Sequence, residues 1–335
     1  LHDKYKFRIY AYNFSKVNDQ YTKRIRNAVY CFREIGELSD PEIVRLVRND
    51  KIDIAIDLNG YTTNNKKSIF AYRLSKIQIN FLGYPGTLGS EWIDYIIADK
   101  VIIPEENIKY YSEKVIFMPN SLQCIDNALK RSKKVFTRRE LGLPEDAFIF
   151  CNFGINQKIS PLEFDIWMKI ISRVENSILW LLESNSISKS NLISHAKSRG
   201  VDESKIHFCK KIDFKLHMSR QMCADLYLDT FNYNSGFMTF LALRSCLPVL
   251  TLTGKSYSAR ISTSILKSIG LKNLITTSKS EYEECAYNFT KDIDSYKLIK
   301  DKLIELQNKS PYFNTKIYTK NLENHYINLV HNNTN

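Results

Sequence analysis

The sequence predicts an α/β protein made of two domains, each with a mostly parallel sheet. Short runs of β-branched and aromatic residues alternate along the chain with segments of helical spacing, which is the order of parallel strands joined by helical crossovers. The 335 residues suffice for about two domains that each bury a core. Residues 127–139 are polar, basic and without an apolar period, so we place the interdomain linker there.

The predicted strands of the first domain end at turn residues, as strands of a sheet commonly do. They are Phe7–Tyr12, Ile52–Leu58, Ile77–Leu82, Asp94–Ala98 and Val115–Met118. Helical spacing is present in residues 41–49 and 66–74. Gly83, Gly86 and Gly89 follow the third strand, where glycine lets the backbone approach a ligand, although an ordinary loop fits the same pattern.

The second domain shows a more regular alternation. Its predicted strands are Phe148–Phe153, Ile178–Leu182, Ile206–Cys209, Leu226–Leu228, Pro248–Leu252 and Leu274–Thr276. Helical segments such as Pro161–Val174 and Ser188–Arg199 separate them, so the sheet should be parallel with helices on both faces. The tail from Pro311 to about Val330 has the pattern of one long amphipathic helix.

Residues 225–260 contain the candidate ligand site. Two apolar strands flank a helix that begins near Ser235-Gly236, at the carboxyl ends of the strands, where open parallel sheets bind their ligands. A diphosphate there would meet unpaired backbone N–H groups and the positive end of the helix dipole. A strand-helix-strand unit with no ligand explains this stretch equally well.

Composition narrows the class of protein. Hydrophobic residues make up 44% and charged residues 25%, as in ordinary globular proteins. No apolar run approaches the about 20 residues that span a bilayer, and there is no signal-peptide pattern, so we expect a cytoplasmic protein. The 7 cysteines include no Cys-x-x-Cys pair, which favours reduced thiols over a zinc site or disulfides.

The net charge of +12 does not by itself indicate a nucleic-acid-binding protein. The basic residues are spread along the chain and form neither a dense tract nor a recognition motif. Anionic small ligands such as nucleotides, or compositional bias alone, explain the excess as well. Nucleic-acid binding is therefore the least supported of the functions considered.

Several blocks resemble the catalytic region of O-linked N-acetylglucosamine transferases, glycosyltransferase family 41. They are IDLNGYT (Ile56–Thr62), IQINFLGYPGT (Ile77–Thr87), IDYIIAD (Ile93–Asp99), YSEKV (Tyr111–Val115), ELGLPEDAFIFCNF (Glu140–Phe153), SILWLLE (Ser177–Glu183) and SPYFNTKIYT (Ser310–Thr319). The resemblance runs in order through nearly the whole chain. It implies a GT-B fold of two Rossmann-like lobes: an acceptor-side lobe over 1–133, a nucleotide-sugar lobe over 134–310 and a C-terminal helix over 311–335 that crosses back to the first lobe.

The resemblance also implies an activity. Members transfer a sugar, N-acetylglucosamine or a related hexose, from a UDP-sugar to a Ser or Thr hydroxyl of a protein, with inversion and without a metal or other cofactor. They usually carry tetratricopeptide repeats ahead of the catalytic region, and none are visible in this sequence. The family pattern places a further strand-helix unit before Leu1, so we expect the first lobe to lack that unit.

Family positions map onto particular residues. Lys158 matches the lysine that contacts the leaving diphosphate, and a plain solvated residue before a helix is the alternative. The other nucleotide-sugar positions are His217, Asn234, Ser235, Gly236, Phe237, Met238, Gly254 and Arg260, and those of the acceptor side and cleft are Asn59, Tyr61, Gly83, Tyr84, Pro85, Gly86 and Thr87. Asp292-Ile293-Asp294 mimics a metal-binding Asp-x-Asp, but N-capping of a helix explains it better.

Departures from the family cluster at the ligand site. The His-Thr-Thr that opens the central helix is Gly236, Phe237 and Met238 here, and a ribose-binding acid falls on Leu241. A glutamine before the lysine falls on Ile155, and an acceptor-side histidine on Cys31. Lost hydrogen bonds to charged groups cost about 1.5–3 kcal/mol each. A catalytically inactive homologue that acts as a binding or scaffolding subunit therefore stays open beside an active enzyme.

Overall fold

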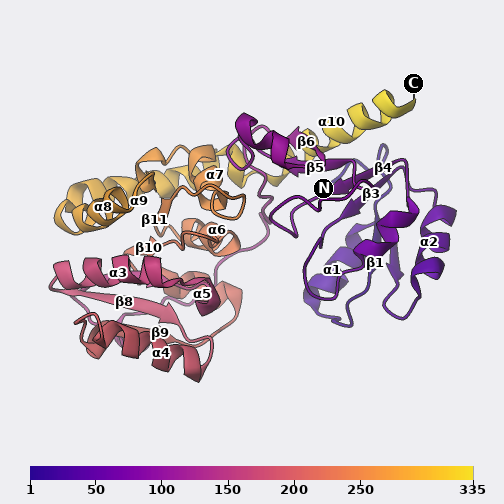
Figure 1. Ribbon diagram of the computed structural model, residues 1–335. Helices are drawn as coiled ribbons and strands as arrows, with labels where there is room; N and C mark the ends of the chain where they lie inside the picture. Colours follow the sequence, from indigo (N-terminus) through magenta and orange to yellow (C-terminus); the bar gives the residue numbers. More distant parts are fainter. Residues whose placement is uncertain (335) are drawn as a thin grey trace. The chain divides into compact units, whose positions relative to one another are not determined.

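The computed structural model describes residues 1–334, which form two compact units. Unit 1 comprises residues 1–122 together with the C-terminal helix from Lys316, and unit 2 comprises residues 123–315. Every strand pair in the described residues is parallel (Figure 1). The predicted α/β class with parallel sheets is therefore confirmed. Among the described helices, none has the length and apolar character needed to cross a membrane.

Unit 1 contains two parallel sheets. In one, β1 (Tyr10–Asn13) pairs with β2 (Cys31–Glu34), and the strand order of the other is β3-β4-β5-β6. The remaining bounds are β3 (Ile54–Asp57), β4 (Ile77–Asn80), β5 (Tyr95–Ala98), β6 (Lys114–Phe117), α1 (Gln20–Ala28), α2 (Asp40–Asn49) and the 3-10 helices η1 (Lys67–Tyr72) and η2 (Glu105–Tyr110). Whether the lobe lacks a strand-helix unit stays a prediction.

Several elements of unit 1 differ from the sequence-based expectation, among them strand β2 (Cys31–Glu34), which was not predicted. Helix α1 was not expected, and none of its side chains is buried. The segment predicted as an α-helix over 66–74 forms the 3-10 helix η1 instead. It ends at Arg73, whose backbone is left-handed with φ of 53°, a conformation that cannot continue a right-handed helix.

The C-terminal segment is interrupted at its start. Pro311 begins a short 3-10 helix, η7 (Pro311–Phe313), and the long helix α10 runs over Thr315–Thr334, so the single helix expected from Pro311 is two elements. Within unit 1, Leu322 and Tyr326 of α10 are each only 6% exposed. The Tyr326 ring lies 6.5 Å from that of Phe7, and the side chain of Glu323 accepts a hydrogen bond from the Asp3 N–H. The apolar face of α10 is therefore packed against the N-terminal residues.

Unit 2 has a sheet of order β12-β11-β10-β7-β8-β9. Its strands are β7 (Phe148–Asn152), β8 (Ser177–Leu182), β9 (Ile206–Cys209), β10 (Leu226–Leu228), β11 (Val249–Leu252) and β12 (Ile275–Thr276). Its helices are α3 (Pro161–Arg173), α4 (Ser186–Lys197), α5 (Phe214–Gln221), α6 (Phe237–Arg244), α7 (Ile261–Ser268), α8 (Lys279–Lys291) and α9 (Ile293–Lys309), and its 3-10 helices are η3 (Arg139–Leu141), η4 (Asn156–Lys158), η5 (Glu203–Lys205), η6 (Lys272–Leu274) and η7.

The core of unit 2 explains its continuous apolar strands. Helices α3 and α4 lie on opposite sides of β8 and β9 (Figure 1), so β8 buries the side chains of both its faces. Trp180 of β8 and Trp167 of α3 are fully buried in this core. Burying such aromatic side chains contributes about 1.5–3 kcal/mol or more each. An alternating strand pattern would have left one face of this sheet polar.

The acidic pair near the end of unit 2 caps a helix. Asp292 precedes α9, and its carboxylate accepts a hydrogen bond of 2.9 Å from the Ser295 N–H. The predicted capping role is therefore confirmed. Within residues 1–334, no group of three or more His, Cys, Asp and Glu side chains is arranged to hold a metal ion.

Truncation of the buried face of α10 should destabilise unit 1. We expect Leu322→Ala to lower the free energy of unfolding by about 2–4 kcal/mol, because it removes a buried side chain and leaves a cavity. Urea denaturation followed by circular dichroism measures this. Leu298→Ala, at a side chain that is 68% exposed on α9, is the matched control and should change stability by less than about 0.5 kcal/mol. Equal effects of the two substitutions would contradict the packing of α10.

Candidate functional site

The strand order of unit 2 reverses between β7 and β10. From β7 the chain proceeds outward through β8 and β9, and then returns to place β10, β11 and β12 on the other side of β7. At such a reversal, the loops that follow the two neighbouring strands diverge and leave a crevice at the carboxyl edge of the sheet. The loops after β7, β10 and β11 carry most of the nucleotide-sugar residues expected from the sequence.

Lys158 ends the 3-10 helix η4, in the loop after β7. Its ammonium donates a hydrogen bond of 3.1 Å to the carbonyl oxygen of Asn234 and lies 4.0 Å from the centroid of the Tyr233 ring. Burial lowers the pKa of Lys158 below the ordinary lysine value, and the carboxylate of Asp229 opposes that shift. The structure thus places this cation directly beside the loop that leads into α6.

Asn234 and Ser235 act as supports of that loop rather than as open side chains. The Asn234 amide donates to the carbonyl of Thr230 at 2.8 Å, and its oxygen accepts from the Ser262 N–H at 3.1 Å. The hydroxyl of Ser235 accepts a 2.9 Å hydrogen bond from Tyr227. Both residues are buried, so they fix the start of α6 from the inside.

Asp229 is the anchor of the loop after β10, and sequence analysis did not single it out as a site residue. One carboxylate oxygen accepts from the Ser235 N–H and the other from the Thr251 hydroxyl, each at 2.8 Å. Burial raises the pKa of Asp229, and hydrogen bonds from Ser262, Ser235 and Thr251 oppose the rise. The signal in the sequence was an acid that closes an apolar strand, a pattern that a simple turn shares.

Gly236 supplies the backbone turn that begins α6. Its φ of +51° and ψ of −101° form a conformation that favours glycine. In the described residues, the backbone N–H groups of Gly236 and Phe237 have no hydrogen-bond partner. The side chain of Phe237 is 43% exposed and that of Met238 is partly buried. The helix start can therefore bind an anion through its backbone but not through these side chains.

The loop after β11 folds back on the same place. Gly254 donates to the carbonyl of Ala259 at 2.9 Å, and a Cβ on Gly254 would lie only 2.4 Å from the Cβ of Ala259, so this tight loop requires glycine. Arg260 donates to the carbonyl of Gly254 at 3.0 Å. The Asn234 N–H donates to the Ser258 carbonyl at 2.9 Å, which joins this loop to the loop after β10.

His217 lies in the interior of α5 and is already engaged by protein groups. Arg220 donates to its Nδ1 at 2.9 Å, and its Nε2 lies 2.7 Å from the amide nitrogen of Gln221. Its ring packs edge-on against Phe153 at 4.9 Å. Burial and the nearby guanidinium lower the pKa of His217 to about 3, so the imidazole is neutral at physiological pH.

The residues of unit 1 that the sequence analysis expects on the acceptor side come together on the loops after β3 and β4. The Asp57 carboxylate accepts from the N–H groups of Asn59 and Gly60, and the Tyr61 hydroxyl donates to the Leu88 carbonyl at 2.8 Å. The rings of Tyr61 and Tyr84 meet at 5.3 Å. The remaining members of this group, Gly83, Pro85, Gly86 and Thr87, lie in the loop that leads from β4 to Leu88.

Two features hold the loop after β4 in place. A Cβ on Gly83 would lie 1.8 Å from the carbonyl oxygen of Leu58, so the two loops approach through backbone that only glycine permits. The buried carboxylate of Glu113 accepts hydrogen bonds from the Thr87 hydroxyl and from the Leu88 N–H, the latter at 2.7 Å. Glu113 belongs to the YSEKV block, and its supporting role was not predicted.

Comparison with known proteins gives a consistent result. The model of glycosyl transferase family 41 matches residues 1–130 and 123–322. The probable UDP-N-acetylglucosamine–peptide N-acetylglucosaminyltransferase SEC of Arabidopsis thaliana is 30% identical over 336 aligned positions, which cover 98% of this chain and 34% of the relative. The SPINDLY protein of Solanum lycopersicum, described by the same probable activity, is 28% identical over 97% of this chain and 35% of its own.

Solved structures share the fold. A variant of the Thermobaculum terrenum O-GlcNAc transferase superposes with a TM-score of 0.89 at 23% identity, over 98% of this chain and 62% of that protein. Anabaena HepE, solved in complex with UDP, superposes with a TM-score of 0.61 at 12% identity, over 96% of this chain and 93% of its own. These matches establish the GT-B fold. This chain spans about a third of the length of the curated relatives.

The buried neutral His217 should make stability depend on pH. The folded-state pKa of about 3 lies below the ordinary histidine value of 6.5, so only the unfolded chain takes up this proton as the pH falls below 6.5. The stability is fully present above pH 6.5 and declines toward pH 3, by about 2 kcal/mol at pH 5. Urea denaturation between pH 7.5 and 5 measures the slope.

His217→Gln provides the test of that assignment, because glutamine does not titrate. We expect the loss of stability between pH 7.5 and 5 to be smaller in this variant by about 2 kcal/mol. The control His195→Gln, on the surface helix α4, should keep the wild-type slope. An unchanged slope in the His217 variant would show that its imidazole titrates normally.

Proposed function

Because this chain belongs to glycosyltransferase family 41, we propose that it acts in a UDP-sugar-dependent protein O-glycosyltransferase. The reaction transfers N-acetylglucosamine or a related hexose from UDP to a Ser or Thr hydroxyl of an acceptor protein. It proceeds with inversion, without a metal ion, and needs no cofactor besides the UDP-sugar donor. The Arabidopsis and tomato relatives, which are described as peptide N-acetylglucosaminyltransferases, support the donor and the acceptor class.

The position of Lys158 is the observation that carries this proposal. Its ammonium is hydrogen-bonded to the Asn234 carbonyl, two residues before the glycine that begins α6, at the reversal of strand order. A diphosphate seated at the helix start would therefore meet a fixed cation and unpaired backbone N–H groups together. Both are in place before the reaction, so little reorganisation is needed when charge develops.

These groups act when the bond between the sugar and UDP breaks. The electron pair of that bond goes to the diphosphate, which gains a negative charge that bulk water would otherwise solvate. The Lys158 ammonium and the N–H groups of Gly236 and Phe237 stabilise that charge. Arg260 shapes the loop that closes the site through its hydrogen bond to the Gly254 carbonyl. Because the interaction with Lys158 is strongest once the charge has developed, it mainly raises kcat.

The loops of unit 1 form the acceptor side in this proposal. Asn59, Tyr61 and the residues from Gly83 to Thr87 occupy the carboxyl ends of β3 and β4, and Glu113 fixes their backbone. Loops at this edge of a parallel sheet are where open α/β proteins bind substrates. A tetratricopeptide-repeat region outside this chain would be a further partner in acceptor binding, in keeping with relatives that are about three times as long.

The apolar side chains at the start of α6 define the alternative. Phe237 and Met238 cannot donate hydrogen bonds, so the nucleotide site depends on Lys158 and on the backbone. An inactive homologue that serves as a binding or scaffolding subunit would tolerate this loss, whereas an enzyme must still hold UDP. Nucleotide binding therefore separates the two functions.

Calorimetric titration with UDP is the first test. We expect saturable binding at or below millimolar UDP. The double substitution Phe237→Thr with Met238→Thr should tighten binding by about tenfold, because each new hydroxyl can donate to a phosphate oxygen. Gly236 is left unchanged, since its φ of +51° would strain any side chain placed there. Absence of binding by the wild type and by the folded double variant would favour the scaffolding function.

Substitution of the proposed catalytic lysine is the second test. Lys158→Ala should reduce kcat by about 100-fold while changing the Kd of UDP much less, since the charge is needed most when the diphosphate departs. Sugar transfer from UDP-N-acetylglucosamine to a Ser/Thr peptide measures kcat, and calorimetry measures Kd. Lys255→Ala removes an exposed lysine from the loop after β11 and is the matched control. A Lys158 variant with wild-type kcat would refute the assigned role.

A further inference from the structure

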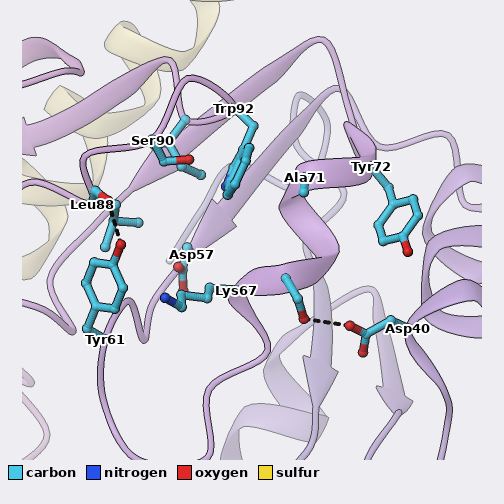
Figure 2. Close-up of a pocket in the computed structure, with 11 residues that line it drawn as sticks. Asp40, Asp57, Tyr61, Lys67, Ala71, Tyr72, Leu88, Ser90 and Trp92 are labelled. Atoms are coloured by element: carbon cyan, nitrogen blue, oxygen red, sulfur yellow. Dashed lines mark hydrogen bonds between the residues drawn. The ribbon is translucent and has the colours of Figure 1, made fainter.

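A second candidate binding site lies within unit 1 (Figure 2). It is a pocket of about 470 Å³ formed by the loop after β3, the 3-10 helix η1 and the segment that precedes β5. Its principal side chains are Asp57, Tyr61, Lys67, Tyr72, Ser90 and Trp92. All of them belong to residues 1–122, whereas the nucleotide-binding residues belong to unit 2.

Two buried polar atoms of this pocket have no hydrogen-bond partner. Asp57 is only 5% exposed, and although one of its oxygens accepts from the N–H groups of Asn59 and Gly60, the other, Oδ2, has no partner within residues 1–334. The hydroxyl of Ser90 is likewise buried and unpaired in the described chain. Leaving such groups unpaired costs free energy, which a ligand with hydrogen-bond donors would recover.

The charges around the pocket select the ligand. Asp40 at its edge is engaged by Lys66 at 3.6 Å and by the Ser68 hydroxyl, while the ammonium of Lys67 lies 3.6 Å from the centroid of the Tyr61 ring. An anionic ligand would meet the two carboxylates, and a cationic ligand would meet the lysine already held at that ring. A neutral ligand that carries hydroxyl groups avoids both penalties.

Exposed aromatic rings complete the site. Trp92, Tyr72 and Tyr61 are 43%, 51% and 49% exposed, although large aromatic side chains usually bury most of their surface. The C–H face of a sugar ring packs on such aromatic faces, while its hydroxyls donate to carboxylate and hydroxyl oxygens. The volume lies within the range of about 300–1,000 Å³ that is typical of small-molecule sites.

We propose that this pocket binds a neutral sugar ring. The ring stacks on Trp92 and donates hydroxyl hydrogen bonds to Asp57 Oδ2 and Ser90 Oγ. This site goes beyond the proposed transfer reaction, which requires only the UDP-sugar and the acceptor hydroxyl. A sugar held here would come from a glycan or from free sugar, because the ligand chemistry is the same in the two cases.

Intrinsic fluorescence can report on this pocket selectively. The chain has 3 tryptophans, and of these Trp167 and Trp180 are buried in unit 2 while Trp92 is exposed in the pocket. The whole chain is titrated with N-acetylglucosamine, with glucose, and with a β-1,4-linked disaccharide of N-acetylglucosamine as a model glycan. We expect saturable quenching with a millimolar Kd, and stronger binding of the disaccharide if the natural source is a glycan.

Variants connect the signal to the proposed contacts. Asp57→Asn keeps one oxygen to cap the loop but removes the unpaired acceptor, and Ser90→Ala removes the hydroxyl. Each should weaken sugar binding by about tenfold, which corresponds to one lost hydrogen bond. Asp53→Asn, the same charge change at an exposed position just before β3, should have no effect. Trp92→Phe should abolish the quenching, because it removes the fluorescent ring. Binding of the disaccharide to this variant should still be detected by NMR.

The outcome of this experiment is independent of the nucleotide site. UDP binding by calorimetry is measured on the same variants and should be unchanged, which also shows that each variant is folded. Absence of saturable quenching up to 100-fold above the expected range, or quenching that Asp57→Asn and Ser90→Ala leave unchanged, would overturn the proposal. If glucose 6-phosphate or n-butylammonium bound as tightly as the neutral sugars, the selection of a neutral ligand would be overturned. A fluorescence response to a Ser/Thr peptide alone would show that the pocket binds polypeptide instead.

Discussion

The proposed nucleotide site of unit 2 depends on the hydrogen bonds of the buried Asp229 carboxylate. One oxygen holds the backbone of Ser235 and the other holds the Thr251 hydroxyl, so a single side chain joins β10, the start of α6 and β11. A buried carboxylate is costly unless donors surround it, and hydroxyl and backbone N–H donors of Ser235, Thr251 and Ser262 do so here. Because these donors come from β11, from α7 and from the segment before α6, the carboxylate ties the three elements together. The residual attraction between Asp229 and Lys158 adds the loop after β7 to the same assembly.

As a consequence, the backbone geometry of this site does not depend on the side chains at the start of α6. Phe237 and Met238 offer no side-chain hydrogen bond at the start of α6, but the glycine turn, the buried Asn234 and the hydrogen bond from Lys158 to the Asn234 carbonyl define its geometry. Substitution by any residue except proline keeps the backbone N–H, so the helix start remains able to bind an anion as long as its geometry is held. Selection on the side chains can then alter affinity without dismantling the site.

In unit 1, too, a single residue, Leu88, connects several loops. The Glu113 carboxylate accepts from the Leu88 N–H, and the Tyr61 hydroxyl donates to the Leu88 carbonyl. Leu88 therefore joins the loop after β4 to the loop after β3 and to the residue that precedes β6. Leu88 and Tyr61 both line the pocket of unit 1 as well. The backbone that shapes the acceptor-side loops therefore also shapes the pocket. Asp57 Oδ2 and Ser90 Oγ, which find no hydrogen-bond partner in the described part of the chain, are the atoms that the proposed sugar would engage.

The sequence by itself determined the fold class, the six strands of unit 2 to within one or two residues at most ends, and the capping role of Asp292. These features follow from the period of the apolar residues and from local hydrogen bonds, both of which depend on residues close together in the sequence. Family resemblance further selected Lys158 and the loops of both units. Only the tertiary structure showed that His217 is buried beneath Arg220 and Gln221, that Asp229 anchors three loops, and that Asp57, Ser90 and Trp92 share one pocket. The burial and hydrogen bonding of these side chains depend on tertiary contacts between residues far apart in the sequence, and no local sequence pattern encodes those contacts.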